Sequence, residues 1–288
     1  MNGKGQADDH RRERLDVLLV ERGMAATREK ARRSIMAGEV MVDGVCETKP
    51  GTFIKSASEI NLKPSKGEGT YVSRGGEKLH KALTTFGINV KDRVVIDVGA
   101  STGGFTDCLL QHGAKRVYAV DVGYGQLAWE LRNDSRVIVL ERTNVRYIEA
   151  DSIPESVDLV TIDVSFISVT KFLARLMTFL RDDGGLIILI KPQFEAGREK
   201  VQRGGVVRDP KVHTAVIREL IGFMEEIGIK IRGLTYSPIT GPAGNIEFLV
   251  YGIKGETPTQ DYYPVEEISK TVETAHQDLA MRDPRKET

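Results

Sequence analysis

A glycine-rich turn is the first feature of this sequence whose residue types and spacing could bind a ligand. Residues 93–123 are predicted to form a strand, a turn, a helix and a second strand. Within the turn DVGASTGGF, three residues separate Gly99 from Gly103 and Gly104, whereas dinucleotide-binding folds use the pattern G-x-G-x-x-G. The spacing argues against a dinucleotide but allows another nucleotide-like ligand, because glycines let the backbone approach a ligand closely.

Polar side chains at the ends of the predicted strands extend this candidate ligand site. Asp121 ends the second strand, where it could accept hydrogen bonds from ribose hydroxyls, and Asp97 could brace the turn or reach an amino group. Asn144 could contact a base edge, and Asp163 follows the fourth strand, where ligands of parallel sheets bind. The alternative is an ordinary glycine turn with an exposed aspartate. The donor set favours S-adenosylmethionine, with the candidates Asp97, Gly99, Ala100, Ser101, Thr102, Gly103, Gly104, Phe105, Asp121, Asn144 and Asp163.

The elements that must position these residues alternate between strand and helix patterns, from VVIDVG to GGLIILIKPQ. This alternation predicts an α/β fold with a mainly parallel sheet covered by helices. The later segment IRGLTYSPITGPAGNIEFLVYGIK predicts two strands whose connection is too short for a crossover helix, so the last strand is expected to be antiparallel. This layout resembles the Rossmann-like, seven-stranded sheet of S-adenosylmethionine-dependent methyltransferases. Cys108 and Trp129 are expected to pack in its core.

A separate small unit is predicted at the start of the chain. Apolar residues recur at helical spacing up to Gly23, a predicted helix stop, and Thr27 could cap a second helix. Asp43 and Gly44 then form a pair that tight hairpin turns favour. The stretch RLDVLLVERGMAATREKARRSIMAGEVMVDG resembles the S4 domain, a small α+β RNA-binding module.

The second predicted helix of this unit carries basic side chains that could straddle the phosphates of folded RNA. A solvated helix face is the alternative, because most charge clusters are of that kind. The S4 resemblance favours RNA binding, and the candidate residues are Arg14, Arg28, Lys30, Arg32, Arg33 and Arg74.

Composition narrows the function classes. The 41 Lys and Arg residues balance 41 Asp and Glu residues, so any basic surface must be local. The two cysteines lie far apart, which argues against a disulfide framework or a metal cluster, and no metal is expected. The N-terminal residues lack the apolar region of a signal peptide, and the apolar runs are too short to span a bilayer. We therefore expect a soluble cytoplasmic protein without a membrane partner.

Proline, glycine and lysine residues in KPSKGEGT predict a linker between the two parts. The chain is accordingly divided into an S4-like domain at 1–62, a linker at 63–72 and a methyltransferase-like domain at 73–254. A polar tail at 255–288 is expected to contain one peripheral helix.

Six motifs carry a more specific resemblance. YVSRGGEKL, DVGASTGGFTD, AVDVGYGQL, ERTNVR, DVSFIS and KPQFE follow the S4-like domain in this order. The order resembles the TlyA family of ribosomal RNA 2′-O-methyltransferases, also labelled hemolysins, over almost the whole chain. The resemblance implies an FtsJ-related core that methylates the ribose of cytidine in 16S and/or 23S rRNA within ribosomal subunits. It also implies a catalytic tetrad, which falls on Lys78, Asp163, Lys191 and Glu247.

The implied chemistry explains why such residues are needed. A ribose hydroxyl is a poor nucleophile, so its attack on a sulfonium methyl benefits from proton removal and from strict positioning. A second ammonium disfavours the charged form of an amine, so Lys78 could activate Lys191 as a base while the two carboxylates orient the amines. Lys191 is thus predicted to lie nearest the 2′-hydroxyl, as base or as stabiliser of the developing alkoxide. Lys81 is a second candidate for the first lysine, although Lys78 keeps the motif spacing.

Three rival functions are weighed against this interpretation. A membrane-active hemolysin needs a membrane span, a strongly amphipathic helix or a secretion signal, and the sequence shows none of these. A catalytically inactive RNA-binding or ribosome-assembly factor conflicts with the intact acidic and lysine positions. A small-molecule methyltransferase leaves the S4-like domain unexplained.

Overall fold

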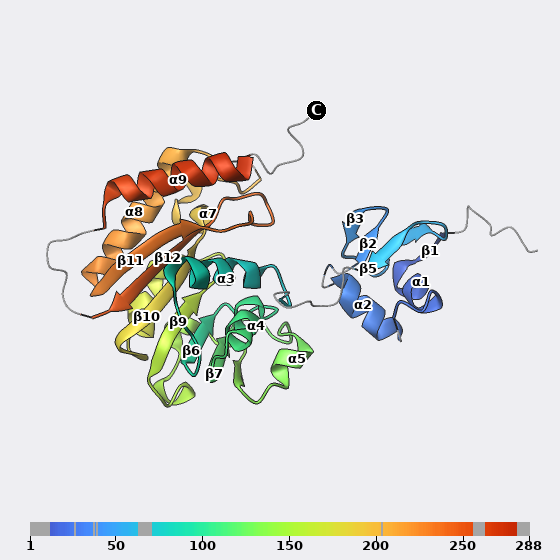
Figure 1. Cartoon of the computed structure of the whole chain (residues 1–288), viewed down its shortest axis with the longest axis horizontal. Coiled ribbons are helices and arrows are strands. Elements are labelled where there is room, and N and C mark those ends of the chain that lie inside the picture. Colours follow the sequence, from blue (N-terminus) through green and yellow to red (C-terminus); the bar gives the residue numbers. More distant parts are fainter. Residues whose placement is uncertain are drawn as a thin grey trace, which may run out of the picture. The chain divides into compact units, whose positions relative to one another are not determined.

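The chain divides into two compact units, Met1–Thr70 and Tyr71–Thr288 (Figure 1). The structure is a computed structural model that describes residues 12–25, 27–36, 38, 40–62, 71–202, 204–255 and 263–280. Most of the predicted linker at 63–72 therefore lies outside the described residues. The S4-like stretch and the glycine-rich turn fall in different units.

The described part of the first unit consists of two helices and five short strands. Helices α1 (Leu15–Glu21) and α2 (Arg28–Met36) pack against each other. Strand β2 (Val40–Val42) pairs with β3 (Val45–Glu47) and β5 (Ile60–Leu62). Strand β1 (Arg12–Arg14) pairs with β4 (Phe53–Lys55). Apolar side chains from both helices and from β2 are fully buried between these elements, which gives the unit its own small core.

Local signals in the sequence set the boundaries of these elements. Gly23 has a φ of 69° just beyond the end of α1, a conformation that favours glycine. At the start of α2 the Lys30 N–H donates to Thr27 Oγ1 at 3.2 Å, so Thr27 caps the helix as predicted. Asp43 and Gly44 both have positive φ and connect β2 to β3, which confirms the hairpin. The pairing of β1 with β4 was not predicted, because three-residue strands are too short to show a period.

A seven-stranded sheet spans the second unit. In spatial order its strands are β11 (Ile229–Tyr236), β12 (Phe248–Lys254), β10 (Leu180–Ile190), β9 (Val157–Ile162), β6 (Val94–Val98), β7 (Arg116–Val120) and β8 (Val137–Leu140). The strands from β10 to β8 pair in parallel, and β12 is antiparallel to both of its neighbours. The predicted mainly parallel sheet with an antiparallel last strand is confirmed.

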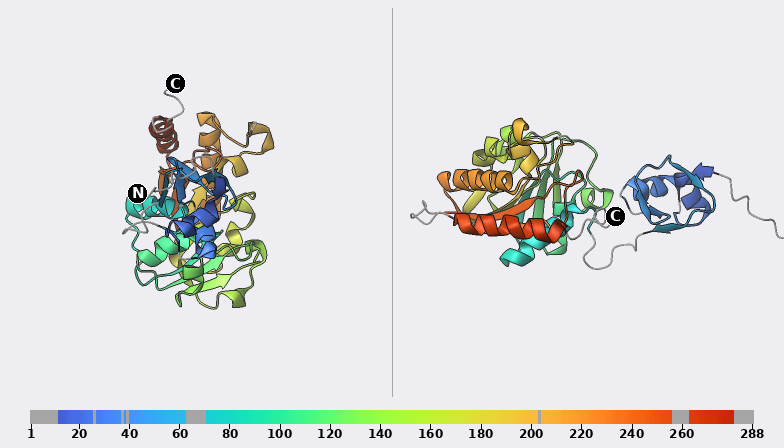
Figure 2. Two further views of the ribbon diagram at one scale, coloured as in Figure 1. Left: turned by 90° about the vertical axis from the view of Figure 1, so that its right-hand side faces the viewer. Right: turned by 90° about the horizontal axis from the view of Figure 1, so that it is seen from above.

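Helices cover both faces of this sheet (Figures 1 and 2). Successive strand residues point to opposite faces, so Val95 packs in one layer and Ile96 in the other. Cys108 is fully buried in the first layer, as predicted. That layer contains α3 (Gly75–Phe86), α4 (Gly104–Gln111) and α5 (Trp129–Arg132), and the second contains α6 (Leu173–Leu176), α8 (Pro210–Glu226) and α9 (Val265–Ala280).

The last described helix belongs to the core of this unit. Ile268, Val272 and Ala275 on α9 are buried against α8 and the sheet, whereas the sequence predicted a peripheral helix in a polar tail. His213 on α8 and His276 on α9 also contact each other, with Nδ1 of the first 2.9 Å from Nε2 of the second. The spaced apolar residues of α9 therefore complete one face of the sheet domain.

Candidate active site

Three residues of the predicted tetrad lie at one edge of the sheet. Asp163 directly follows β9, Lys191 directly follows β10, and Glu247 directly precedes β12. Because β12 runs antiparallel to β10, the start of β12 lies beside the end of β10. Lys78 comes from α3, in the layer that covers this sheet. The chain thus brings residues from distant segments to the edge where parallel sheets bind ligands.

Two ion pairs connect the four residues. Lys78 Nζ lies 2.5 Å from Glu247 Oε2, and Lys191 Nζ lies 2.6 Å from Asp163 Oδ1. Lys191 Nζ also donates to Ser165 Oγ at 2.9 Å. Burial raises the pKa of Glu247, the positive charges of Lys78 and Lys191 oppose this rise, and the negative charge of Asp163 adds to it. The two pairs are therefore close enough to affect each other.

Lys78, and not Lys81, is the lysine that contacts Glu247. The Lys78 and Glu247 side chains are 10% and 1% exposed, so their ion pair is almost excluded from water. Lys81 lies one turn further along α3 and is partly exposed. Charges attract more strongly where water is excluded, so this pair is a rigid part of the site.

The glycine-rich turn packs tightly against other parts of the protein. At Gly99, which has a φ of 85°, an added Cβ would lie 2.5 Å from the Asp163 carbonyl oxygen. At Gly103, with a φ of 98°, it would lie 2.2 Å from the Leu131 side chain. At Gly104 it would lie 2.3 Å from Ser73 Oγ. These glycines are therefore required for packing within the protein, a reason that the sequence interpretation, based on close approach to a ligand, did not include.

Asp121 organises the turn between β6 and α4. Its carboxylate accepts hydrogen bonds from the N–H groups of Ser101 (2.8 Å) and Gly123 (2.6 Å). Each carboxylate oxygen has a further lone pair, so the group can still accept hydrogen bonds from a ribose diol. Ser101 and Thr102 are exposed at this turn, whereas Ala100 and Phe105 are buried beneath it.

Asp97 and Asn144 have structural partners. The fully buried Asp97 carboxylate accepts hydrogen bonds from Thr106 Oγ1 (2.6 Å) and Thr161 Oγ1 (3.1 Å), so it braces the turn, the first of its two predicted roles. Burial raises the pKa of Asp97 to about 7, against the effect of these hydrogen bonds. Asn144 Oδ1 accepts a hydrogen bond from the Arg146 N–H at 3.1 Å and caps a short 3₁₀ turn, which leaves its amide N–H₂ as the group that could meet a base.

Exposed aromatic side chains follow the strand ends on the same edge, and sequence reasoning missed them. Tyr124 follows β7, Tyr147 follows β8 and Phe166 follows β9, and they are 67%, 70% and 90% exposed. The Arg142 guanidinium lies 4.1 Å from the centre of the Tyr124 ring. Trp129 is 68% exposed, so the prediction that it packs in the core is wrong. Aromatic residues in the loops that follow the strands were the signal that could have revealed this surface.

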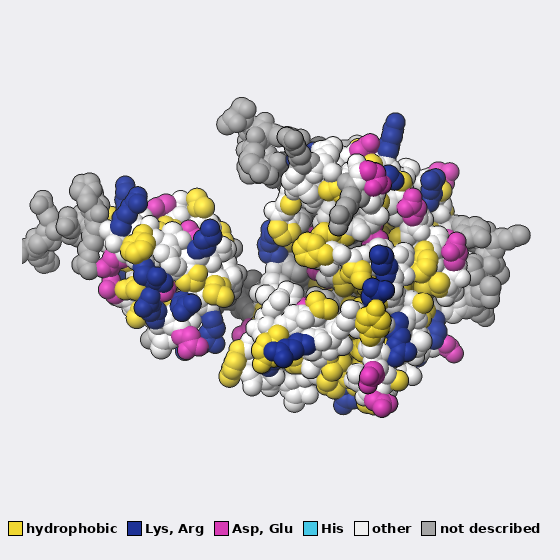
Figure 3. All heavy atoms as spheres, turned by 180° about the vertical axis from the view of Figure 1, so that it is seen from behind, with side chains coloured by type: hydrophobic (Ala, Val, Ile, Leu, Met, Phe, Trp, Pro, Cys, Tyr) yellow, Lys and Arg dark blue, Asp and Glu magenta, His cyan; other side chains and the backbone are white. Residues whose placement is uncertain are grey.

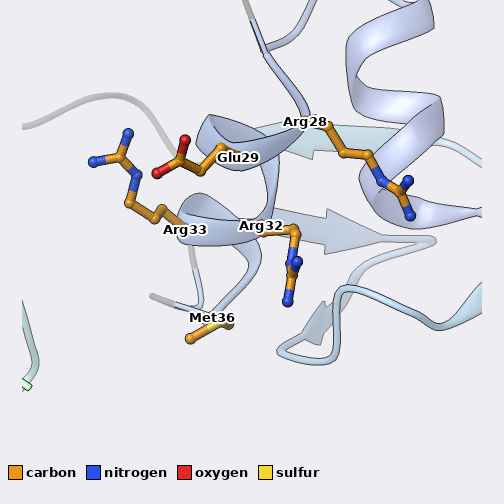
Figure 4. A pocket seen from close by; sticks show the side chains of 5 residues that line it. All are labelled: Arg28, Glu29, Arg32, Arg33 and Met36. Carbon is orange, nitrogen blue, oxygen red and sulfur yellow. The ribbon is translucent and has the colours of Figure 1, made fainter.

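The candidate RNA-binding residues belong to both units. Figure 3 shows several Lys and Arg side chains gathered on one face of the first unit. In Figure 4, Arg28, Arg32 and Arg33 extend from α2 in different directions around a shallow pocket that Glu29 and Met36 complete. Lys30 is exposed on the same helix. Arg14 lies on β1 of this unit, whereas Arg74 is exposed just before α3 in the second unit.

Comparisons with known proteins agree with this arrangement. A family model described as FtsJ-like methyltransferase matches residues 71–254, and an S4 domain model matches residues 13–60. A Bacillus subtilis (strain 168) protein named "Putative rRNA methyltransferase YqxC" is 53% identical over 271 residues, which cover 93% of this chain and 96% of that protein. The Mycobacterium tuberculosis (strain ATCC 25618 / H37Rv) protein named "16S/23S rRNA (cytidine-2'-O)-methyltransferase TlyA" is 44% identical over 241 residues, or 84% of this chain and 90% of that protein. The chain belongs to the TlyA family.

A solved structure that is similar to this chain supports the same fold. The structure named "Putative hemolysin from Streptococcus thermophilus" matches 94% of this chain and 98% of that chain, with a TM-score of 0.74 and 45% identity. The expected pairing of an S4 domain with an FtsJ-like methyltransferase domain in a TlyA protein is therefore confirmed. Among the described residues, no group of three or more His, Cys, Asp or Glu side chains could hold a metal ion.

Proposed function

We propose that this protein transfers a methyl group from S-adenosylmethionine to the ribose 2′-hydroxyl of a cytidine in 16S and/or 23S rRNA, within ribosomal subunits in the cytoplasm. The observation that carries the proposal is the pair of Lys–carboxylate contacts beside the glycine-rich turn, Lys78 with Glu247 and Lys191 with Asp163. The name of the Mycobacterium tuberculosis relative supports the substrate class, since that name specifies cytidine-2′-O methylation of 16S and 23S rRNA.

The residues of the turn fit the proposed cofactor. Asp121 lies at the end of β7 with acceptor capacity for two ribose hydroxyls, and Asp163 lies at the end of β9 next to the turn. The hydrogen bonds of Asp97 and the close packing at the glycines hold the turn in place. When bound, S-adenosylmethionine supplies a methyl group on a positively charged sulfur. The chain's own task is to hold a ribose oxygen in line with that methyl group.

In this proposal Lys191 contacts the ribose oxygen. A protonated lysine has three N–H donors. One donates to Ser165 Oγ, and Asp163 Oδ1 lies 2.6 Å from Nζ as the ion-pair partner. A further N–H can donate to the 2′-oxygen and stabilise negative charge that develops during attack, and in its neutral form the amine can instead accept the proton. The buried Lys78–Glu247 ion pair lies close enough for the charge of Lys191 to affect the pKa of Glu247. Proton removal requires a lysine at this position, whereas charge stabilisation requires only a fixed positive charge.

The two units divide RNA binding between them in this proposal. The basic face of the first unit binds the phosphate backbone without reading sequence, as the S4 domain assignment suggests. The exposed rings of Tyr124, Tyr147 and Phe166 offer flat surfaces on which unpaired bases near the target ribose can stack. Recognition of folded rRNA thus combines charge with stacking.

The rival functions give different outcomes in one experiment. No helix in the described part of the chain is long and apolar enough to cross a membrane.

The test is transfer of tritiated methyl from S-adenosylmethionine to purified 30S subunits, 50S subunits and free rRNA, by wild-type protein and by Lys191→Ala. We expect Lys191→Ala to lose about 10² to 10⁴ in rate, the usual contribution of a general base, while it keeps cofactor binding in calorimetry.

Lys191→Arg separates the two roles of the amine. A guanidinium stays protonated, so it can stabilise charge but cannot accept a proton. An inactive arginine variant supports proton removal, and a nearly active one assigns Lys191 to charge stabilisation. Wild-type protein that binds RNA and cofactor but transfers no methyl group would support the inactive assembly factor instead, and lysis of erythrocytes without methylation would support the hemolysin.

A further inference from the structure

The S4 domain contains a buried carboxylate that sequence analysis did not single out. Asp16 lies in the first turn of α1, and its side chain is fully buried. Its Oδ1 accepts from Arg14 Nε at 2.9 Å, and its Oδ2 accepts from Arg14 Nη2 at 3.0 Å and from Arg28 Nε at 3.0 Å. One carboxylate therefore binds two guanidinium groups from different elements, β1 and α2.

The backbone fixes the carboxylate, and the two arginines stay accessible. The Asp16 N–H donates to the Pro50 carbonyl, and the Leu15 N–H donates to the Thr52 carbonyl, so the start of α1 is tied to the loop before β4. The side chains of Arg14 and Arg28 are 39% and 56% exposed. Hydrogen bonds from Arg14 lower the pKa of Asp16, burial opposes them, and the single hydrogen bond from Arg28 lowers it further, so the carboxylate stays charged at neutral pH.

We infer that Asp16 is a positioning residue that fixes Arg14 and Arg28 as a preformed clamp for RNA phosphates. Asp16 uses two of the five N–H donors of Arg14 and one of the five of Arg28, on the inner edges of both groups. The outer edges keep the planar geometry that binds phosphate oxygens in pairs. The inference rests on the proposed function, in that it takes RNA as the ligand of the S4 domain.

For Asp16→Asn, the clamp predicts weaker RNA binding, whereas simple charge attraction predicts stronger RNA binding. Asp16→Asn removes one negative charge from a basic surface, so unspecific attraction alone would strengthen RNA binding. In a clamp, the amide puts an N–H₂ group against a guanidinium and releases both arginines, which then no longer hold the geometry that contacts phosphate. Loss of the two phosphate contacts is expected to weaken binding about 10-fold and to lower the slope of log K against log salt by about 2.

The experiment measures binding of the full chain to purified 30S and 50S subunits across a salt series, for wild type, Asp16→Asn and the matched control Glu29→Gln. Glu29 is exposed next to Arg28 on α2, and its neutralisation should leave binding unchanged or tighter. In the Asp16→Asn background, adding Arg14→Ala and Arg28→Ala should cost little more, because the arginines are already released. Tighter binding by Asp16→Asn, or full additivity, would overturn the clamp.

A second variant keeps the test decisive if Asp16→Asn unfolds the domain in a thermal melt. Arg28→Lys keeps the charge and a contact to Asp16 but lacks the planar fork, so it should bind as weakly as Arg28→Ala. The matched control Arg218→Lys, at an exposed position of α8 outside the candidate RNA-binding residues, should bind like wild type. Wild-type affinity for Arg28→Lys would reject the clamp. Methylation is assayed in parallel, so subunit binding that depends on Asp16 without any methyl transfer would uphold this inference and reject the proposed activity.

Discussion

Replacing Lys78 by methionine removes one partner of a buried ion pair, and we expect a large loss of stability. The Glu247 side chain is 1% exposed, so without Lys78 its charge has neither water nor its nearest partner. Breaking a buried pair from one side typically costs about 3–5 kcal/mol. The total free energy of unfolding of such proteins is about 5–15 kcal/mol, so this single change should remove a large share of it.

A double-mutant cycle separates the pair from its surroundings. Lys78→Met and Glu247→Gln should each destabilise the protein, whereas the double variant should recover much of the loss, because neutral groups of similar volume can replace a buried pair at little cost. Urea denaturation followed by circular dichroism measures the free energy of unfolding of all four proteins at constant pH. All three variants should be inactive in methyl transfer, since recovery of packing does not restore the charges of the site.

The pH dependence of stability gives an independent check on Glu247. Because its pKa is raised above the ordinary 4.5, the folded protein holds a proton over a range of pH in which the unfolded chain has released it. The free energy of unfolding should therefore fall as the pH rises from about 4.5 to the raised pKa, and Glu247→Gln should remove this fall. A loss below about 1 kcal/mol for Lys78→Met, the usual value for an exposed pair, would refute the reasoning.

Three further predictions concern the cofactor, the domains and the second helical layer. Asp121→Ala should weaken S-adenosylmethionine binding in calorimetry, because the turn loses the acceptor that orients Ser101, and wild-type affinity would remove Asp121 from the site. A chain of residues 71–288 should keep cofactor binding but lose ribosomal methylation, and the activity of the full chain should fall as the salt concentration rises. Undiminished methylation by the shorter chain would reject the assignment of RNA binding to the first unit. Burial, with the charge of His276, lowers the pKa of His213 to about 4. The free energy of unfolding should therefore decrease as the pH falls from about 6.5 to about 4. In His213→Gln, the slope of the free energy of unfolding against pH should be smaller over this range.

The sheet and its order of elements could be predicted because they depend on local patterns. A few neighbouring residues are enough to predict each of these features, which are the alternating strands and helices, the Thr27 cap and the Asp43–Gly44 turn. Glu247 is different, because its partner Lys78 lies 169 residues away and no local pattern links them. The family resemblance supplied that pair, and the structure explains it through the antiparallel position of β12.

The burial of individual side chains and their partners could not be predicted from the sequence. Trp129 was expected in the core because tryptophan is apolar, but the four-residue helix α5 leaves it exposed. Asp16 was passed over because an aspartate in a first helical turn is ordinary, and its two arginine partners come from other elements. The glycines of the turn were assigned to ligand approach, whereas Leu131 and Ser73 occupy the space that their side chains would need.

The most direct test of the central claim is the chemical identity of the methylated nucleoside. Purified 30S and 50S subunits are incubated with the protein and isotopically labelled S-adenosylmethionine, the rRNA is digested to nucleosides, and the products are separated by liquid chromatography with mass spectrometry. The proposal predicts labelled 2′-O-methylcytidine with wild-type protein and none with Lys191→Ala. A label on a base, on a nucleoside other than cytidine, or at the same level with Lys191→Ala would contradict it.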